Sequence, residues 1–235
     1  MLTKQIIIDK LKSYADTKKA DGAKIYYPTK MIVLGVKVPD LKNILKEFKP
    51  ELKQISEKEK IKLIKDLVNT NILECQQFGF EIINGDKKLL HFLTENDAFA
   101  MKTNMDNWLS VDYFAGVIIG PLWREKIIPY KTIEQLAKSS DFWERRIAVV
   151  ATVALNQKAR GGKGDAEQTL KVCSLVKNDS NDMVIKALSW ALRELAKIEK
   201  QAVIDFMENN NDCLSPRIKK EVGNKLIFGT KTSKS

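Results

Sequence analysis

Apolar side chains recur with the spacing of an α-helix along most of the chain. In residues 4–18, Ile7, Leu11 and Tyr14 fall on one stripe, three or four positions apart. The same spacing predicts helices over residues 39–48, 57–68, 73–84, 86–93, 107–119, 131–138, 142–156, 166–176, 182–197, 200–209 and 215–226. No stretch shows the clear alternation of a half-buried strand. The pattern therefore predicts an all-α protein.

Three of the predicted helices form a loose repeat. The segments NWLSVDYFAGVIIG, FWERRIAVVATVAL and DMVIKALSWALREL each join a polar or aromatic opening to a long apolar stripe, and they begin 35 and 40 residues apart. This period, with two helices per unit, is typical of HEAT or armadillo-like repeats. We therefore expect residues 1–228 to form one domain, a right-handed superhelical solenoid of helix pairs with a concave basic groove, followed by a short basic tail at 229–235.

The composition gives the chain a strong net positive charge. The 235 residues include 40 Lys and Arg against 30 Asp and Glu, a net charge of +10 that is spread along the chain. Such a balance favours a polyanionic partner such as nucleic acid, although a lysine-rich genome composition would produce the same excess.

The cysteine spacing and the hydropathy of the sequence indicate a reducing compartment. Cys75, Cys173 and Cys213 lie far apart without a CxxC pair, which is typical of small buried side chains in a reducing environment. Charges interrupt the N-terminal apolar positions, and no apolar run is long enough to cross a bilayer. We expect a cytosolic protein, nucleoid-associated in a bacterium or nuclear in a eukaryote, without a membrane partner.

Metal and nucleotide chemistry find little support. The one histidine, His91, lies in the apolar segment KKLLHFLTEN, where we expect a packed residue and not a ligand. The scattered cysteines complete no metal set, so no cofactor is expected. The loop ARGGKGD, residues 159–165, lacks the spacing of a P-loop. It is either a flexible linker or a loop whose backbone amides, Arg160 and Lys163 contact a phosphodiester backbone.

Four residues on the repeated helices are unusual for purely structural positions: Trp108, Asp112, Arg146 and Trp190. Taken singly, a helical Trp belongs to the core, an Arg snorkels, and an Asp caps or faces water. The spacing i, i+4 puts Trp108 and Asp112 on one helical face, which is either solvated or looks into a site. Together, one carboxylate, two indoles and a guanidinium on three inner helices describe a specific environment.

These segments resemble the AlkD-like family of DNA alkylation repair glycosylases, which are built from HEAT-like repeats. The resemblance covers most of the chain and is strongest in NWLSVDYF, WERRIAVV and KALSWALRELAK, and weaker in LGVKVPDLKNI. It implies that the W-x-x-x-D element is Trp108 and Asp112, that the arginine of the following repeat is Arg146, and that the later tryptophan is Trp190. The family is understood to include DNA-binding members without glycosylase activity.

The resemblance implies excision of N3- or N7-alkylated purines from double-stranded DNA, as in base excision repair. Such a base already carries positive charge, so it leaves as a neutral molecule and needs no general acid. Asp112 would stabilise the oxocarbenium charge on the deoxyribose and orient the water. Trp108 and Trp190 would flank the cationic nucleotide.

We expect the remaining DNA contacts to come from cationic and aromatic side chains. Arg146 would hold a phosphate, with Arg145 beside it, and Tyr26 and Lys37 would lie at the N-terminal end of the groove. Two alternatives to a monofunctional glycosylase stay open: a non-catalytic module that binds distorted DNA, and a HEAT-repeat scaffold for an acidic protein. No obligate protein partner is evident from the sequence.

Overall fold

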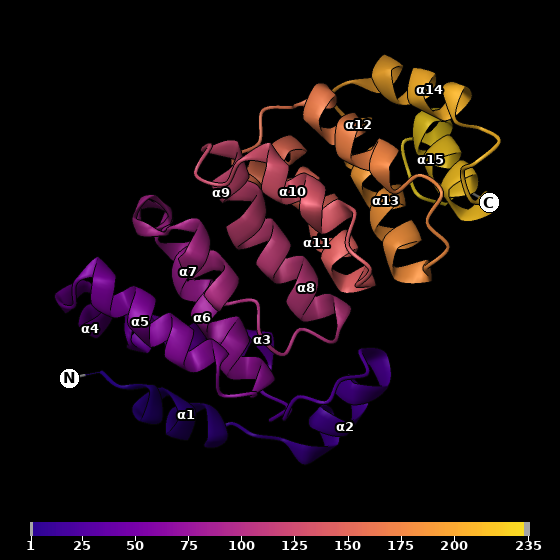
Figure 1. Ribbon diagram of the computed structural model, residues 1–235. Helices are drawn as coiled ribbons and strands as arrows, with labels where there is room; N and C mark the ends of the chain where they lie inside the picture. Colours follow the sequence, from indigo (N-terminus) through magenta and orange to yellow (C-terminus); the bar gives the residue numbers. More distant parts are fainter. Residues whose placement is uncertain (1, 233–235) are drawn as a thin grey trace. The chain divides into compact units, whose positions relative to one another are not determined.

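The computed structural model describes residues 2–232 and divides into two compact units (Figure 1). Unit 1 comprises residues 1–114 and unit 2 residues 115–235. Within the described range every named element is helical, and the β-structure is limited to one isolated bridge between Ile32 and Ile72. The prediction of an all-α protein is confirmed.

Unit 1 is organised around α6, Leu73–Gly85, which packs against α1, α3, α5 and α8. Phe78, Phe80 and Ile83 of α6 are fully or almost fully buried and form the centre of its core. The unit's elements are α1 (Lys4–Lys12), α2 (Thr17–Tyr26), α3 (Val38–Glu47), α4 (Lys49–Gln54), α5 (Glu57–Val68), α6, the 3-10 helix η1 (Lys87–Phe92), α7 (Glu95–Ala100) and α8 (Trp108–Phe114).

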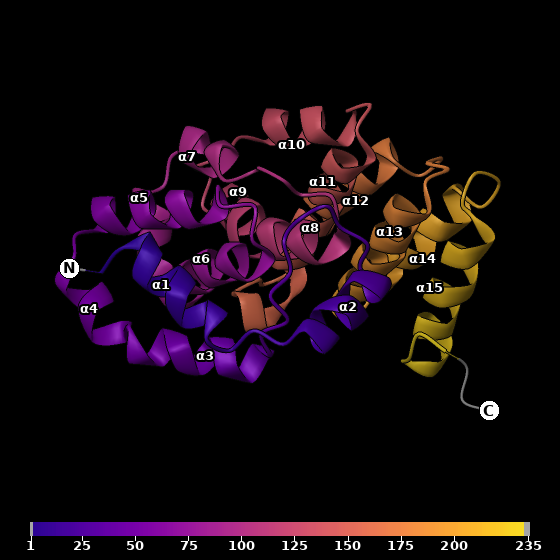
Figure 2. The same cartoon turned by 90° about the horizontal axis from the view of Figure 1, so that it is seen from below.

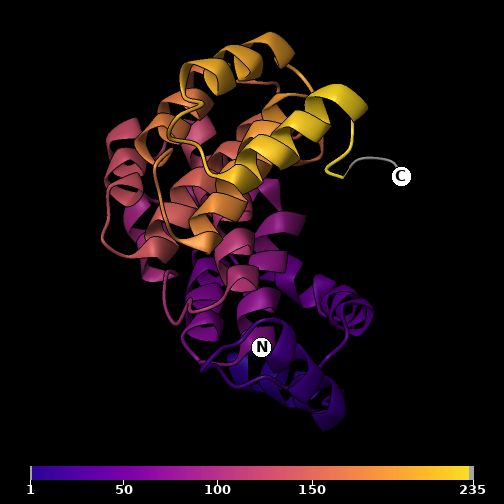
Figure 3. The same ribbon diagram turned by 90° about the vertical axis from the view of Figure 1, so that its right-hand side faces the viewer.

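Unit 2 is organised around α11, Phe142–Asn156, whose residues 146–156 are all buried. It packs against α9, α10, α12 and α13, and α13 in turn packs against α15 (Figures 2 and 3). The unit's elements are the π-helical turn η2 (Ala115–Ile119), α9 (Gly120–Arg124), α10 (Tyr130–Ala137), α11, the 3-10 helix η3 (Lys158–Arg160), α12 (Ala166–Leu175), α13 (Asp182–Leu195), α14 (Lys200–Asn209) and α15 (Pro216–Phe228).

Helix boundaries agree with the apolar pattern in several places and differ in others. The bounds of α5, α11 and α14 are those predicted. The first predicted helix was too long, because the chain turns after Lys12 and begins α2 at Thr17. The predicted helix at 86–93 is a 3-10 helix, and the one at 107–119 changes to π-helical geometry at Ala115. Helices α4, α7 and α9 were missed.

Helix pairing within each unit agrees with a helical-repeat fold. Neighbouring helices such as α5 and α6, or α10 and α11, pack on one another, as the stacked units of a solenoid do. The single domain, the right-handed superhelical course and the concave groove concern the two units together, and these stay predictions. No helix in residues 2–232 has the length and apolar character to span a membrane.

The described part of the predicted basic tail folds back onto α15. Lys231 forms an ion pair with Glu221, with a nitrogen–oxygen distance of 3.3 Å, and its carbonyl oxygen accepts a hydrogen bond from Asn224 at 3.1 Å. Lys234, the other cation of the predicted tail, lies outside the described residues.

The cysteines are arranged much as their spacing predicts. Cys75 and Cys173 are fully buried, and Cys213 is half-buried with its thiol on the carbonyl of Asn210 at 3.2 Å. Burial raises the pKa of Cys75 to about 11 and that of Cys173 to about 12. These two thiols are therefore protonated at neutral pH.

Candidate functional site

Helix α8 carries the tryptophan and aspartate of the predicted site. Asn107 precedes the helix and caps it, since its side-chain oxygen accepts from the backbone N–H of Ser110 at 3.0 Å. The carboxylate of Asp106 accepts from the hydroxyl of Thr29 and from the backbone N–H of Lys30 at 2.6 Å. These contacts fix the start of α8 against the loop that follows α2, and Trp108 is the first helical residue after them.

Two tyrosines from the end of α2 surround Trp108. Tyr26 meets the indole edge-on, with ring centroids 5.4 Å apart and an interplanar angle of 83°. Tyr27 does the same at 6.2 Å and 89°. Such edge-to-face contacts orient the rings. Tyr26 is 71% exposed while Trp108 is half-buried, so the cluster reaches the surface.

Asp112 lies one turn after Trp108 and is half-buried. The i, i+4 spacing puts both side chains on one face of α8, as the sequence predicts. Unit 1 therefore brings together Tyr26, Trp108 and Asp112: two aromatic rings in contact, and a carboxylate on the face that carries one of them.

A buried glutamate, which sequence analysis missed, holds the loop between α2 and α3. The carboxylate of Glu74 is 3% exposed and accepts from the backbone N–H groups of Leu34 at 2.9 Å, Gly35 at 2.7 Å and Val36 at 3.3 Å. Its signal in the sequence is a carboxylate within the apolar run of α6. The next residue after this loop, Lys37, is the N-cap of α3 and is exposed.

Unit 2 places the two adjacent arginines in different surroundings. Arg146 is 6% exposed and donates to the backbone carbonyl of Met183 at the start of α13. Met183 and Trp190 lie seven residues apart, two helical turns along one face of α13. Arg146 is thus anchored on the helix that carries Trp190, which is half-buried.

Arg145 ties the start of α11 to neighbouring turns. Its guanidinium pairs with both carboxylate oxygens of Asp179, at 2.5 and 3.3 Å, and donates to the carbonyls of Ser139 and Ser140, each at 2.9 Å. This arginine, predicted to contact DNA, therefore has a structural role here.

The glycine-rich loop after α11 is a packed element. The guanidinium of Arg160 occupies the space that a Cβ on Gly116 would fill, at 2.0 Å from the ideal Cβ position, and its Nε donates to Gln157 at 2.9 Å. The Arg160 carbonyl accepts from Arg124 at 2.8 Å. Arg160, predicted to touch phosphates, is half-buried in these contacts.

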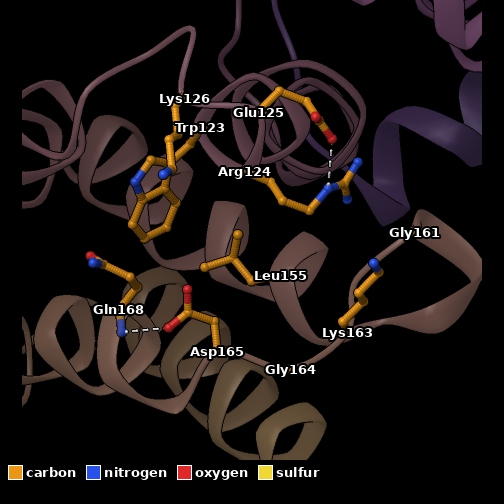
Figure 4. A pocket seen from close by; sticks show the side chains of 10 residues that line it. All are labelled: Trp123, Arg124, Glu125, Lys126, Leu155, Gly161, Lys163, Gly164, Asp165 and Gln168. Atoms are coloured by element: carbon orange, nitrogen blue, oxygen red, sulfur yellow. Dashed lines mark hydrogen bonds and ion pairs between the residues drawn. The ribbon is translucent and has the colours of Figure 1, made fainter.

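Lys163 of the same loop is exposed and borders a cavity of about 440 Å³ (Figure 4). Trp123, Arg124 and Gln168 also border this cavity. Of the two cations predicted to contact phosphate in this loop, Lys163 is exposed and Arg160 is half-buried, and a phosphate contact of Lys163 stays a prediction.

In residues 2–232, no group of three or more His, Cys, Asp or Glu side chains is placed to hold an ion. His91 lies exposed within η1, so the expectation that it would be packed is wrong, because this segment turns its apolar side chains Leu89 and Leu90 inward instead.

Comparison with known proteins identifies the family. A family model described as DNA alkylation repair enzyme matches residues 7–226. This chain belongs to the DNA alkylation repair enzyme family. The family places the protein in DNA repair, with DNA as its substrate.

One solved structure supports the fold. The chain described as a predicted DNA alkylation repair enzyme from Enterococcus faecalis superposes with a TM-score of 0.71, over 90% of the present chain and 95% of that one. The two sequences are 19% identical, so the likeness concerns the fold alone. No curated protein matches the chain.

Proposed function

We propose that this member of the family is a monofunctional DNA glycosylase that hydrolyses the N-glycosidic bond of cationic N3- or N7-alkylated purines in duplex DNA. The observation that carries the proposal is the arrangement on unit 1, where Asp112 lies one turn from Trp108 and Trp108 is held edge-on by Tyr26. Aromatic faces beside a carboxylate suit a substrate that carries positive charge and gains more as it reacts.

The charge of the leaving group explains why one carboxylate suffices. Alkylation at N3 or N7 makes the purine cationic, so the electron pair of the breaking C1′–N bond neutralises the base as it departs. No proton has to be supplied. The sugar becomes oxocarbenium-like, and a fixed carboxylate at about 4 Å would stabilise that charge by roughly 4 kcal/mol at an effective dielectric near 20.

Hydrolysis is completed by water. Its oxygen forms the new bond to C1′, and its proton passes to the Asp112 carboxylate and then to solvent, which leaves an abasic site and the neutral alkylpurine. Trp108 of unit 1 favours a cationic nucleotide through its ring face, at about 0.5–2 kcal/mol. We propose the same kind of ring contact for Trp190 of unit 2. We propose that Arg146 supplies positive charge for a phosphate. Its side chain is 6% exposed and donates to the carbonyl of Met183 at the start of α13.

The proposal is tested by base release from duplexes that differ in one lesion. Under single-turnover conditions, followed by alkaline cleavage of abasic sites, we expect strand scission at N7-methylguanine above the spontaneous rate. Duplexes with uracil, hypoxanthine or ethenoadenine should stay intact, because these neutral bases need an acid. Efficient release of uracil would contradict the mechanism, and binding of duplex without any base release would identify a DNA-binding module.

A further inference from the structure

A second cavity, of about 410 Å³, lies in unit 1 among α3, α4, α5 and α6. Its floor is apolar, formed by Leu45, Leu52 and Ile82. Around it stand four exposed lysines from three separate elements, Lys46, Lys49, Lys53 and Lys88. We refer to it as the lysine-rimmed cavity.

The positive charge of this rim is not neutralised locally. Among the described residues, the ion pairs include none with Lys46, Lys49, Lys53 or Lys88. The two acids that border the cavity, Glu81 and Asp86, already have hydrogen-bond partners, and the partner of Asp86 is Lys60, a fifth lysine of the cavity lining.

Of these acids, Asp86 accepts from the buried Lys60 at 3.2 Å, and Glu81 accepts from Asn84 at 3.2 Å. Lys49 and Lys53 are four residues apart on α4, where like charges repel. A short helix tolerates this pattern more easily when an anion binds the rim.

The lysine-rimmed cavity is remote from the aromatic cluster of the candidate site. In Figures 1 and 2, α4 and α2 lie at opposite ends of unit 1. The cavity borders α4, whereas Tyr26 ends α2. A ligand here would leave Trp108 and Asp112 accessible.

We propose that the lysine-rimmed cavity docks an acidic peptide segment of a partner protein, with one bulky apolar side chain inserted on the floor of Leu45, Leu52 and Ile82 and flanking carboxylates on the rim lysines. The argument is complementarity of both charge and polarity. Interfaces of this kind combine a buried apolar anchor with charged rim contacts that steer and orient the partner.

Nucleic acid fits the same features less well. A phosphodiester backbone uses the lysines but leaves the apolar floor empty, and a duplex keeps its bases stacked away from such a floor. A peptide uses both, because side chains alternate freely between an apolar anchor and carboxylates. The volume is within the range of small-ligand pockets, large enough for one aromatic side chain.

The probe is a fluorescein-labelled peptide with aspartates on both sides of a single phenylalanine, titrated with the full chain at physiological salt. The test variant is Lys49→Glu with Lys53→Glu, and the matched control is Lys58→Glu with Lys62→Glu. The control lysines lie one turn apart on α5, are exposed and do not border the cavity. Both double variants change the net charge equally.

We expect the test variant to weaken peptide binding by at least about tenfold and the control by less than about twofold. Lys88→Glu, on a different element, should act in the same direction as the test variant. Replacing the phenylalanine of the peptide by alanine should cost about tenfold. Circular dichroism and the melting temperature confirm that each variant is folded.

Several results would overturn the proposal. These are absence of binding by the unaltered chain, equal loss in the test and control variants, and unchanged affinity for the alanine peptide. A fourth is a fall in duplex or single-stranded DNA affinity in the test variant as large as the fall for the peptide, which would make this surface a nucleic-acid contact. Base release from N7-methylguanine duplex is measured in parallel and is expected to be unchanged.

Discussion

Two loops that carry or adjoin predicted DNA-contacting residues are fixed by opposite chemistry. In unit 1, residues 28–36 present backbone N–H groups to the carboxylates of Asp106 and Glu74. In unit 2, residues 157–164 present a carbonyl to the guanidinium of Arg124 and N–H groups to carbonyls of Leu155 and Gln157. The first loop depends on buried negative charge, and the second on a cation and on main-chain bonds.

The difference shows where this basic protein uses carboxylates to hold its backbone in place. Charged acceptors make stronger bonds to backbone N–H than neutral ones do. Unit 1 uses them to fix the segment that follows Tyr26 and Tyr27 and leads to Lys37. In unit 2 two arginines, Arg124 and Arg145, bind carbonyls of their own unit, so these cations serve the fold.

The largest expected effect is on the rate of base release, and it distinguishes the proposed catalytic carboxylate from the structural ones. Asp112→Asn keeps the size and removes the charge, so we expect single-turnover release of N7-methylguanine to fall by about 10²–10⁴-fold. The melting temperature and duplex affinity should change little. An unaltered rate would show that Asp112 is not the catalytic group.

A second prediction concerns the glycine of the unit 1 loop. Gly35 has φ +79°, and a Cβ there would lie 2.1 Å from the carbonyl oxygen of Asp16. Because both the conformation and the contact resist a side chain, Gly35→Ala should lower the free energy of unfolding by about 2–4 kcal/mol in urea denaturation.

The matched control for this change is Gly22→Ala on α2, where nothing lies within 4 Å of the added Cβ. Alanine favours the helix there, so Gly22→Ala should raise the free energy of unfolding by about 0.5–1 kcal/mol. Equal effects of the two substitutions would contradict the structural difference between these glycines.

A third prediction compares the two kinds of anchor directly. Glu74→Gln leaves an amide facing three backbone N–H donors, so we expect a loss of about 2–3 kcal/mol in the free energy of unfolding. Arg124→Gln removes donors from the neutral carbonyls of Ala154 and Arg160, where no charged acceptor is lost, and should cost about 1 kcal/mol. A larger loss of unfolding free energy for Arg124→Gln than for Glu74→Gln would contradict the view that the carboxylate is the stronger anchor.

The smallest effect distinguishes the two cations of the glycine-rich loop. Lys163→Ala should reduce the salt dependence of duplex binding by about 0.9 in the logarithmic slope, the value for one phosphate contact. Arg160→Ala should leave that slope unchanged and lower the melting temperature, because its guanidinium packs on Gly116. Identical slopes for Lys163→Ala and the unaltered chain would show that Lys163 makes no phosphate contact.

Periodicity was sufficient where a helix buries a continuous stripe. The segments α5 and α11 do so, and their bounds followed from the apolar pattern. It failed for α2, TKKADGAKIY, in which only Ala20 is buried. Glycine lowers the helix propensity of this segment, and the segment has no apolar stripe, so the sequence did not predict a helix there.

For the candidate site, the sequence predicted which residue types share a helical face, but not which distant residues contact them. The pairing of Trp108 with Asp112 followed from helical spacing, whereas the contact with Tyr26 joins residues more than 80 positions apart. The carboxylates of Glu74 and Asp106 bind backbone 39 and 76 residues away, and no local pattern encodes such bonds. Arg145 and Arg160 are cationic in the sequence, and only the structure shows their internal partners.

The buried thiols have a consequence for a protein that works where DNA is being alkylated. Electrophiles that methylate purines also attack thiolates, and a thiol reacts in proportion to its ionised fraction. With pKa values of about 11 and 12, Cys75 and Cys173 are almost fully protonated at neutral pH and are shielded from solvent. Two of the three most nucleophilic side chains of this repair protein are thereby protected from the same reagents whose damage the family removes.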